Sequence, residues 1–285
     1  MKCEEKLRNH VEQLCMYEKG RHHSVAGSLE HARSYIGEAL RASCGRVRYH
    51  DWTVNGVGRK NIIGSGNSDA MPRVIVEAHY DTVPGTPGAD DNASSVATLL
   101  CLSEQLGKAG LAVEFAVIDA EEPPYFGTKH MGAYHYSQEL EGSDTMVIVL
   151  EMLGFYTETG SAGLVPANLV QFENRVEVES IVAVYPQAQA KARAFGQLMA
   201  DSCALKTHTV ATRERSLMAY CDAYHYLDAG LQTVLVTDTG MLRNPYYHSR
   251  FDSADTLDFE KMGQVLNGLS SAISSFLELP GGEHH

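Results

Sequence analysis

Along most of this chain, segments with the hydrophobic pattern of a strand alternate with segments that have the hydrophobic spacing of a helix. The segment 73–79, Arg-Val-Ile-Val-Glu-Ala-His, has a nearly continuous apolar centre. Strands of this kind are usually buried on both faces, as in parallel sheets. Stretches with helical spacing alternate with such strands along the chain, and this alternation predicts an α/β fold. We therefore expect a three-layer sandwich in which helices flank a mixed, mostly parallel sheet.

The same pattern predicts where the elements lie. The turn signal Asn55-Gly56 separates the first two strands. Residues 154–179 fit neither period and predict loops or a short hairpin. We find no internal repeat and no linker, so we expect one domain over residues 1–285, with a frayed tail at 281–285. The predicted strands are 46–55, 59–63, 73–79, 112–118, 145–150, 181–184 and 233–236, and the predicted helices are 24–41, 93–108, 128–139, 188–202 and 259–277.

Composition narrows the class of protein. The chain has 285 residues, of which 44% are hydrophobic, which is enough for a full buried core. Its net charge of −13 argues against nucleic-acid binding, because phosphate recognition needs clustered Lys and Arg. No apolar run approaches the ~20 residues of a membrane span, so we expect no membrane partner.

The N-terminus and the cysteines indicate a cytoplasmic protein. Residues 1–20 carry scattered charges instead of the continuous apolar stretch of a secretory signal. The six cysteines are widely spaced and form no CxxC pair, so we expect reduced thiols and no thiolate zinc site.

Candidate metal ligands begin at the end of the buried strand. His79 and Asp81 are two residues apart, a spacing that places both on one face of a strand. The carboxylate can then hold one ring nitrogen and leave the other for a metal. The following Asp90-Asp91-Asn92 lies between this strand and a helix, where α/β proteins keep their sites. Alone, this acidic stretch could equally be a helix cap.

Three further segments add ligands of the same kind. Glu121 and Glu122 follow a second strand, Glu151 ends a third, and His248 lies in a loop after a fourth. Each has an ordinary explanation, such as an acidic loop, a strand-ending charge or an exposed histidine. Five strand-end loops that each offer an oxygen or imidazole ligand, in this order, indicate a metal site.

These motifs resemble metallopeptidase family twenty-eight, the bacterial leucyl aminopeptidase group. The resemblance covers about residues 74–257. The motifs that carry it are His79-x-Asp81, Gly88-Ala-Asp-Asp91, Glu121-Glu122, Leu150-Glu151-Met-Leu-Gly154 and Asn244-Pro-x-Tyr-His248.

The resemblance implies a zinc-exopeptidase-like fold with two zinc ions, although cobalt or manganese also suit mixed imidazole and carboxylate ligands. It implies a substrate peptide with a free N-terminus, cleaved through a water activated between the metals. Glu121 would be the general base and Asp81 would orient His79. The implied ligands of one metal are His79, Asp91 and Glu151, and those of the other are Asp91, Glu122 and His248.

Two positions depart from the family pattern. Glu151 stands where the family usually has Asp, and Cys221-Asp222-Ala223 stands where it has Ser-Asp-His. His225, two positions on, is the candidate replacement for the missing histidine. The candidates for the surroundings of the metals and the substrate pocket are Asp222, Tyr220, Tyr224, His225 and Tyr246.

Three other functions stay open at this point. One is a single-zinc glutaminyl cyclase on the same fold, which favours a tryptophan near the last zinc histidine; here Tyr247 precedes His248, and the single tryptophan is Trp52. The second is another metallo-exopeptidase or amidohydrolase, such as a carboxypeptidase, and the third is a non-catalytic binding protein. The pattern sets neither the oligomeric state nor the preferred N-terminal residue.

Overall fold

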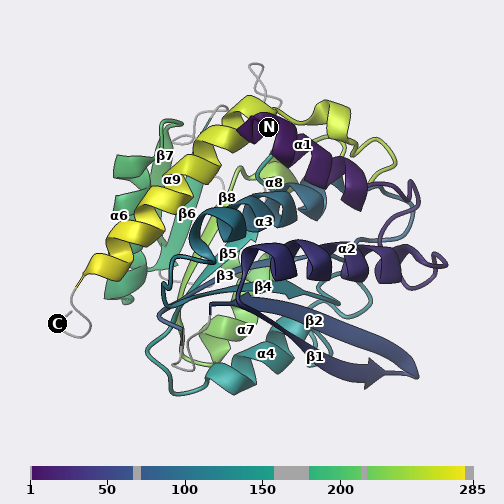
Figure 1. Cartoon of the computed structure of the whole chain (residues 1–285), viewed down its shortest axis with the longest axis horizontal. Coiled ribbons are helices and arrows are strands. Elements are labelled where there is room, and N and C mark those ends of the chain that lie inside the picture. Colours follow the sequence, from purple (N-terminus) through teal and green to yellow (C-terminus); the bar gives the residue numbers. More distant parts are fainter. Residues whose placement is uncertain (1, 67–71, 157–179, 213–216, 280–285) are drawn as a thin grey trace.

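One eight-stranded sheet forms the centre of the molecule (Figure 1). The computed structural model describes residues 2–66, 72–156, 180–212 and 217–279. The strand order is β1-β2-β4-β3-β5-β8-β6-β7. The strands are β1 (Arg46–Val54), β2 (Val57–Ser65), β3 (Val74–His79), β4 (Val113–Ile118), β5 (Met146–Glu151), β6 (Ile181–Pro186), β7 (Thr207–Thr212) and β8 (Gln232–Thr237).

The centre of the sheet is parallel and its flanks are mixed. β4, β3, β5 and β8 run parallel to one another, whereas β2 and β6 pair antiparallel to this centre. Every residue of β3 and β5 is buried. Burial on both faces explains why these strands read as continuous apolar runs. The predicted α/β sandwich with a mixed, mostly parallel sheet is confirmed.

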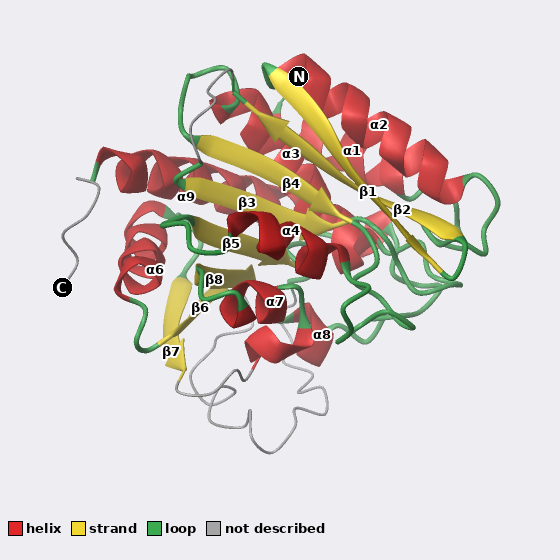
Figure 2. Cartoon of the chain, turned by 90° about the horizontal axis from the view of Figure 1, so that it is seen from below, coloured by secondary structure: helices red, strands yellow, loops and turns green. Residues whose placement is uncertain are grey.

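Helices cover both faces of the sheet (Figure 2). One face carries α4 and α7, whose apolar side chains form a buried cluster with the sheet. The other face carries the larger cluster, to which α1, α2, α3, α6 and α9 contribute. The helices are α1 (Cys3–Leu14), α2 (Ser28–Ser43), α3 (Ser95–Leu106), α4 (Gly132–Leu140), α6 (Ala190–Ser202), α7 (Ala223–Asp228), α8 (Gly240–Arg243) and α9 (Phe259–Glu278), with short turns η1 (Ala89–Ser94), η2 (Leu217–Tyr220) and η3 (Ala254–Thr256).

The β1–β2 hairpin turns where the sequence indicates. Asn55 and Gly56 both adopt left-handed backbone conformations, with φ of 50° and 77°. A two-residue hairpin turn with positive φ at both positions favours Asn-Gly. The second strand begins at Val57, two residues earlier than predicted, because the tight turn lets pairing start at once.

Several elements were missed by the sequence pattern or shifted from it. α1 buries Leu7, Val11 and Leu14, whose i, i+4, i+7 spacing is helical although charges surround it. β7 and α7 were also missed; β7 lies at the sheet edge and is only partly buried, so it lacks an apolar run. The loop predicted over 154–179 and the tail at 281–285 fall largely or wholly outside the described residues.

The two remaining expectations concern the single domain and the absence of a membrane-spanning segment. All described strands join one sheet, and the single domain stays a prediction. Among the described helices, none combines the length and apolar character needed to cross a bilayer.

Candidate metal centre

The carboxyl ends of the central parallel strands bring the predicted ligands to one edge of the sheet. β3 ends at His79, which pairs in register with Ile118 at the end of β4. β5 ends at Glu151, opposite Thr237 of β8. The loops that leave these strands carry Asp91, Glu122 and His248 to the same edge.

Two groups of three ligands form there and share one carboxylate. In the first, His79 Nε2 lies 3.4 Å from Asp91 Oδ1 and 3.5 Å from Glu151 Oε1. In the second, His248 Nε2 lies 3.0 Å from Asp91 Oδ2 and 3.3 Å from Glu122 Oε2. The ligand atoms of each group lie within 4.8 Å of one another. Asp91 therefore offers one oxygen to each group, as a bridging ligand would.

Buried polar atoms without partners show that these groups suit a cation. Among the described residues, His79 Nε2, Glu122 Oε1 and Glu151 Oε2 are buried and make no hydrogen bond. Buried polar atoms are rarely left unpaired, because the lost hydration is costly. Imidazole nitrogens combined with carboxylate oxygens are ligands of zinc and similar divalent ions. The residues present therefore fit a metal pair.

The electrostatics of the ligand groups also indicate missing positive charge. Burial lowers the pKa of His248, but hydrogen bonds to Asp91 and Glu122 outweigh it and raise that pKa to about 10. Burial, and then the charge of Asp91, raise the pKa of Glu122 to about 7. Burial likewise opposes the charged form of His79, yet the charges of Glu151 and Glu121 raise its pKa. The carboxylates of both groups therefore stabilise positive charge between them.

Asp81 connects the histidine to the glutamate pair. His79 Nδ1 donates to the carbonyl oxygen of Asp81 at 3.2 Å, and the Asp81 carboxylate lies 3.7 Å from the same nitrogen. A donating Nδ1 leaves the lone pair of Nε2 for a metal. The two carboxylate oxygens of Asp81 accept hydrogen bonds from the backbone N–H groups of Glu121 and Glu122, at 3.1 and 3.2 Å. Asp81 thus fixes the Glu121–Glu122 turn, a contact that sequence spacing does not indicate.

Asp252 was not identified from the sequence. Its carboxylate accepts hydrogen bonds from the backbone N–H groups of Asp90 and Asp91, at 2.8 and 3.1 Å. This contact ties the loop that follows His248 to the loop that carries the shared ligand. An aspartate in an irregular loop has no periodic signal, and only the fold brings it there.

Glu77 and Asp222 form a second buried feature beside the ligands. Glu77 lies in β3 two residues before His79, with no exposed surface, and its side chain is within hydrogen-bonding reach of Asp222. All four carboxylate oxygens lack a donor among the described residues. Burial and mutual repulsion raise the pKa of Glu77, and burial raises that of Asp222 to about 7. Two carboxyl groups in this arrangement can share one proton.

This pair gives a stability prediction. A glutamine at position 77 can donate an N–H to Asp222, so Glu77→Gln is expected to change the free energy of unfolding by less than about 1 kcal/mol. Glu77→Ala leaves Asp222 buried without a donor and is expected to cost about 2–4 kcal/mol. Urea unfolding of both variants measures the difference. Equal losses would show that Asp222 needs no donor at this position.

The remaining candidates are scattered around the edge of the site. Tyr220 is 52% exposed, and Tyr246 packs edge to face on Phe155. Tyr224 packs edge to face on His225. Asp222 is buried, and its carboxyl group is influenced by His79 as well as by Glu77.

His225, the candidate replacement for the missing histidine, contacts residues at the start of α4, and its role stays a prediction. Its Nε2 lies 3.3 Å from Met131 Sδ, and its ring packs on Tyr134. The α7 helix, which starts at Ala223, packs against α4, so this side chain lies between the two helices.

Tyr247 and Trp52 bear on the comparison with a glutaminyl cyclase, which favours a tryptophan near the last zinc histidine. Tyr247 stacks on the His248 ring, with centroids 3.8 Å apart. Trp52 lies in β1, and its indole ring is tilted by 33° against that of His135, with centroids 4.8 Å apart. Its N–H donates to the carbonyl oxygen of His130. The single tryptophan of the chain therefore packs against the α4 region and not beside His248.

Comparison with known proteins identifies a family and relatives that are similar to this chain. The family model described as Peptidase family M28 matches residues 61–273. Protein YfbL of Escherichia coli (strain K12) is 31% identical over 257 residues, which cover 85% of this chain and 79% of YfbL.

Two solved structures show how widely the fold is shared. The LapA aminopeptidase of Legionella pneumophila superposes with a TM-score of 0.72 at 14% identity, covering 97% of this chain and 73% of LapA. A glutaminyl cyclase of Porphyromonas gingivalis superposes with a TM-score of 0.68 at 15% identity, covering 95% and 98% of the two chains. At these identities the likeness concerns the fold alone, so the distinction between the two activities depends on the site.

Proposed function

Because the chain belongs to peptidase family M28, we propose that it is a metal-dependent aminopeptidase that removes the N-terminal residue from peptides. The observation that carries the proposal is the pair of three-ligand groups that share Asp91. Glu121 lies next to the ligand Glu122 but belongs to neither group of described residues. A carboxylate in this position is free to move a proton.

The ligand assignment follows the two groups. His79, Asp91 and Glu151 would hold one divalent ion, and Asp91, Glu122 and His248 the other. Bound as a pair, two zinc ions would acidify a water molecule and polarise the substrate carbonyl. Such a pair carries four positive charges. The carboxylates of Asp91, Glu122 and Glu151 supply three negative charges, so the partly buried cluster comes close to neutral.

Glu121 is the proposed general base. Its backbone N–H is fixed by Asp81, so the side chain is presented from a rigid turn. Burial raises the pKa of Glu121, even though His79 acts in the opposite direction. A carboxylate whose pKa is shifted toward neutrality can accept a proton from the attacking water and donate one to the leaving amine.

The carboxylates also account for the exopeptidase specificity in this proposal. The free α-amine of a substrate would lie against the metal pair, beside the buried carboxyl group of Glu121. An acylated N-terminus lacks this amine and would bind less well. This preference for a free amine distinguishes an aminopeptidase from a carboxypeptidase on related architecture.

The environment of His248 supports peptide hydrolysis over cyclisation. Each of the two groups has three residues that could bind a metal, whereas a single-zinc cyclase needs only one such group. Tyr247 stacks on His248, and Trp52 packs against His135 instead of forming a wall beside the last ligand.

A substrate panel tests the proposed function. The zinc-loaded chain is expected to release the N-terminal residue from aminoacyl anilides and dipeptides, and to leave N-acetylated versions of the same substrates intact. A peptide with an N-terminal glutamine serves as the probe for cyclisation. Pyroglutamate formation without hydrolysis would contradict the proposal, as would cleavage of no substrate in a broad panel.

A further inference from the structure

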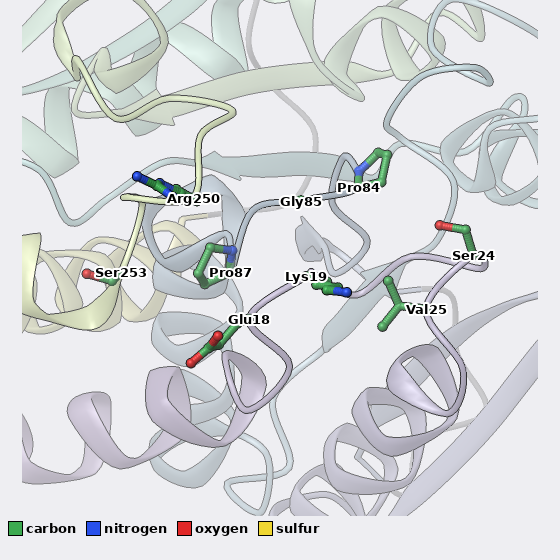
Figure 3. Close-up of a pocket in the computed structure, with 9 residues that line it drawn as sticks. All are labelled: Glu18, Lys19, Ser24, Val25, Pro84, Gly85, Pro87, Arg250 and Ser253. Atoms are coloured by element: carbon green, nitrogen blue, oxygen red, sulfur yellow. The ribbon is translucent and has the colours of Figure 1, made fainter.

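A pocket of about 700 Å³ lies beside the loops that carry two of the ligands. Figure 3 shows three separate segments that meet around it. The first follows α1 and contains Glu18 and Lys19, the second is the loop 84–87, and the third contains Arg250 and Ser253.

Chain connectivity places the pocket close to the metal centre. Arg250 is two residues beyond His248, so their Cα atoms are at most ~7.6 Å apart. Pro87 is four residues before Asp91, which limits the distance between those Cα atoms to ~15 Å. An extended peptide of up to about five residues spans the longer of these two limits, at ~3.3 Å per residue.

The walls of the pocket are held by buried hydrogen bonds. Arg21, which is 1% exposed, donates from Nη1 to the carbonyl oxygen of Pro87 at 2.7 Å and from Nη2 to that of Gly88 at 2.8 Å. The backbone N–H of Gly85 donates to the carbonyl oxygen of Lys19 at 2.9 Å. The segment after α1 and the loop that leads to Asp91 are therefore fixed to each other. These hydrogen bonds hold two walls of the pocket in place.

The pocket carries positive charge in a strongly acidic protein. Lys19 and Arg250 are both in its lining, with Glu18 as the opposing charge. Within the part of the chain that the structure describes, neither basic side chain forms an ion pair. In a chain of net charge −13, two unpaired cations beside the metal loops are a local site for an anion.

We propose that this pocket binds the C-terminal carboxylate of a short peptide whose N-terminal residue lies at the metal centre. The inference rests on the proposed aminopeptidase function and names its substrate class as peptides of about three to five residues. Lys19 and Arg250 would contact the carboxylate and would touch neither the scissile bond nor the metals.

The test compares leucyl tripeptides, tetrapeptides and pentapeptides with their C-terminal amides, using the zinc-loaded full chain. The free acids are expected to have kcat/KM about fivefold higher than the amides at the best length, mainly through KM, as for a charge-assisted contact near the surface. Lys19→Gln and Arg250→Gln are each expected to reduce this ratio to within about twofold. Both should leave the hydrolysis of a leucyl anilide, which is too short to reach the pocket, within twofold of the parent chain.

Lys108→Gln is the matched control, because it removes one exposed positive charge away from the pocket. It should leave the acid-to-amide ratio unchanged. If the parent chain cleaves the anilide but treats acids and amides alike at every length, the carboxylate site is wrong while the aminopeptidase function stands. If nothing is cleaved, the aminopeptidase function fails and this proposal fails with it.

Discussion

Glu121→Gln is expected to lower kcat for peptide hydrolysis at least about a hundredfold while both metals stay bound. General-base transfer contributes ~10²–10⁴-fold to a rate, and an amide cannot accept the proton. The loss should be confined to kcat, because Glu121 belongs to neither ligand group of the described residues. Glutamine keeps the size of the side chain, so the turn fixed by Asp81 should persist.

Glu122→Gln provides the contrast, since it makes the same substitution one residue further along. Glu122 is a ligand of the second group, so this variant should lose metal as well as activity. Metal content and steady-state kinetics of the two variants are measured together. Near-normal activity of Glu121→Gln, with a full metal complement, would exclude this residue as the base.

Asp91→Asn is expected to abolish activity by removing the ligand that both groups share. The variant leaves one group without an oxygen from position 91 and offers the other only a neutral amide oxygen. Substituting residues that merely support metal ligands costs ~10–100-fold in metal affinity, so the loss of a bridging carboxylate should exceed that range. The neutral amide keeps only one oxygen, whereas the carboxylate of Asp91 offers one to each histidine, 3.0 Å from His248 and 3.4 Å from His79.

Zinc binding by competition with a chromophoric chelator measures this effect. Asp255→Asn is the control, because Asp255 is an exposed aspartate outside the ligand groups. The control should retain the zinc affinity and the activity of the parent chain. If Asp91→Asn still bound two zinc ions with the affinity of the parent chain, the bridging role would be excluded.

The fold and the ligand set were predictable because they depend on local rules. A strand buried on both faces has an apolar centre, and the carboxyl ends of parallel strands meet at one edge of the sheet. His79 and Glu151 end such strands, and Glu122 follows one closely, so their meeting point followed from the pattern. The family resemblance then divided these residues between two metals, with Asp91 shared and Glu121 as the base.

The supporting contacts were not predictable because they join distant segments through irregular backbone. Asp252 reaches the amides of Asp90 and Asp91 only once the two loops lie side by side. Glu77 was visible as a single charge within an apolar strand, but its partner Asp222 is 145 positions away in the sequence. The contact of His225 with Met131 was not predictable either, because it depends on how α7 packs against α4.

A zinc titration of the metal-free chain tests the central claim most directly. The chain is treated with a chelator, zinc is added in measured equivalents, and release of the N-terminal residue from an unblocked peptide is followed. A shared Asp91 between two complete ligand groups predicts that activity reaches its maximum at two zinc ions per chain. Saturation at one zinc ion, accompanied by pyroglutamate formation from an N-terminal glutamine peptide, would contradict it.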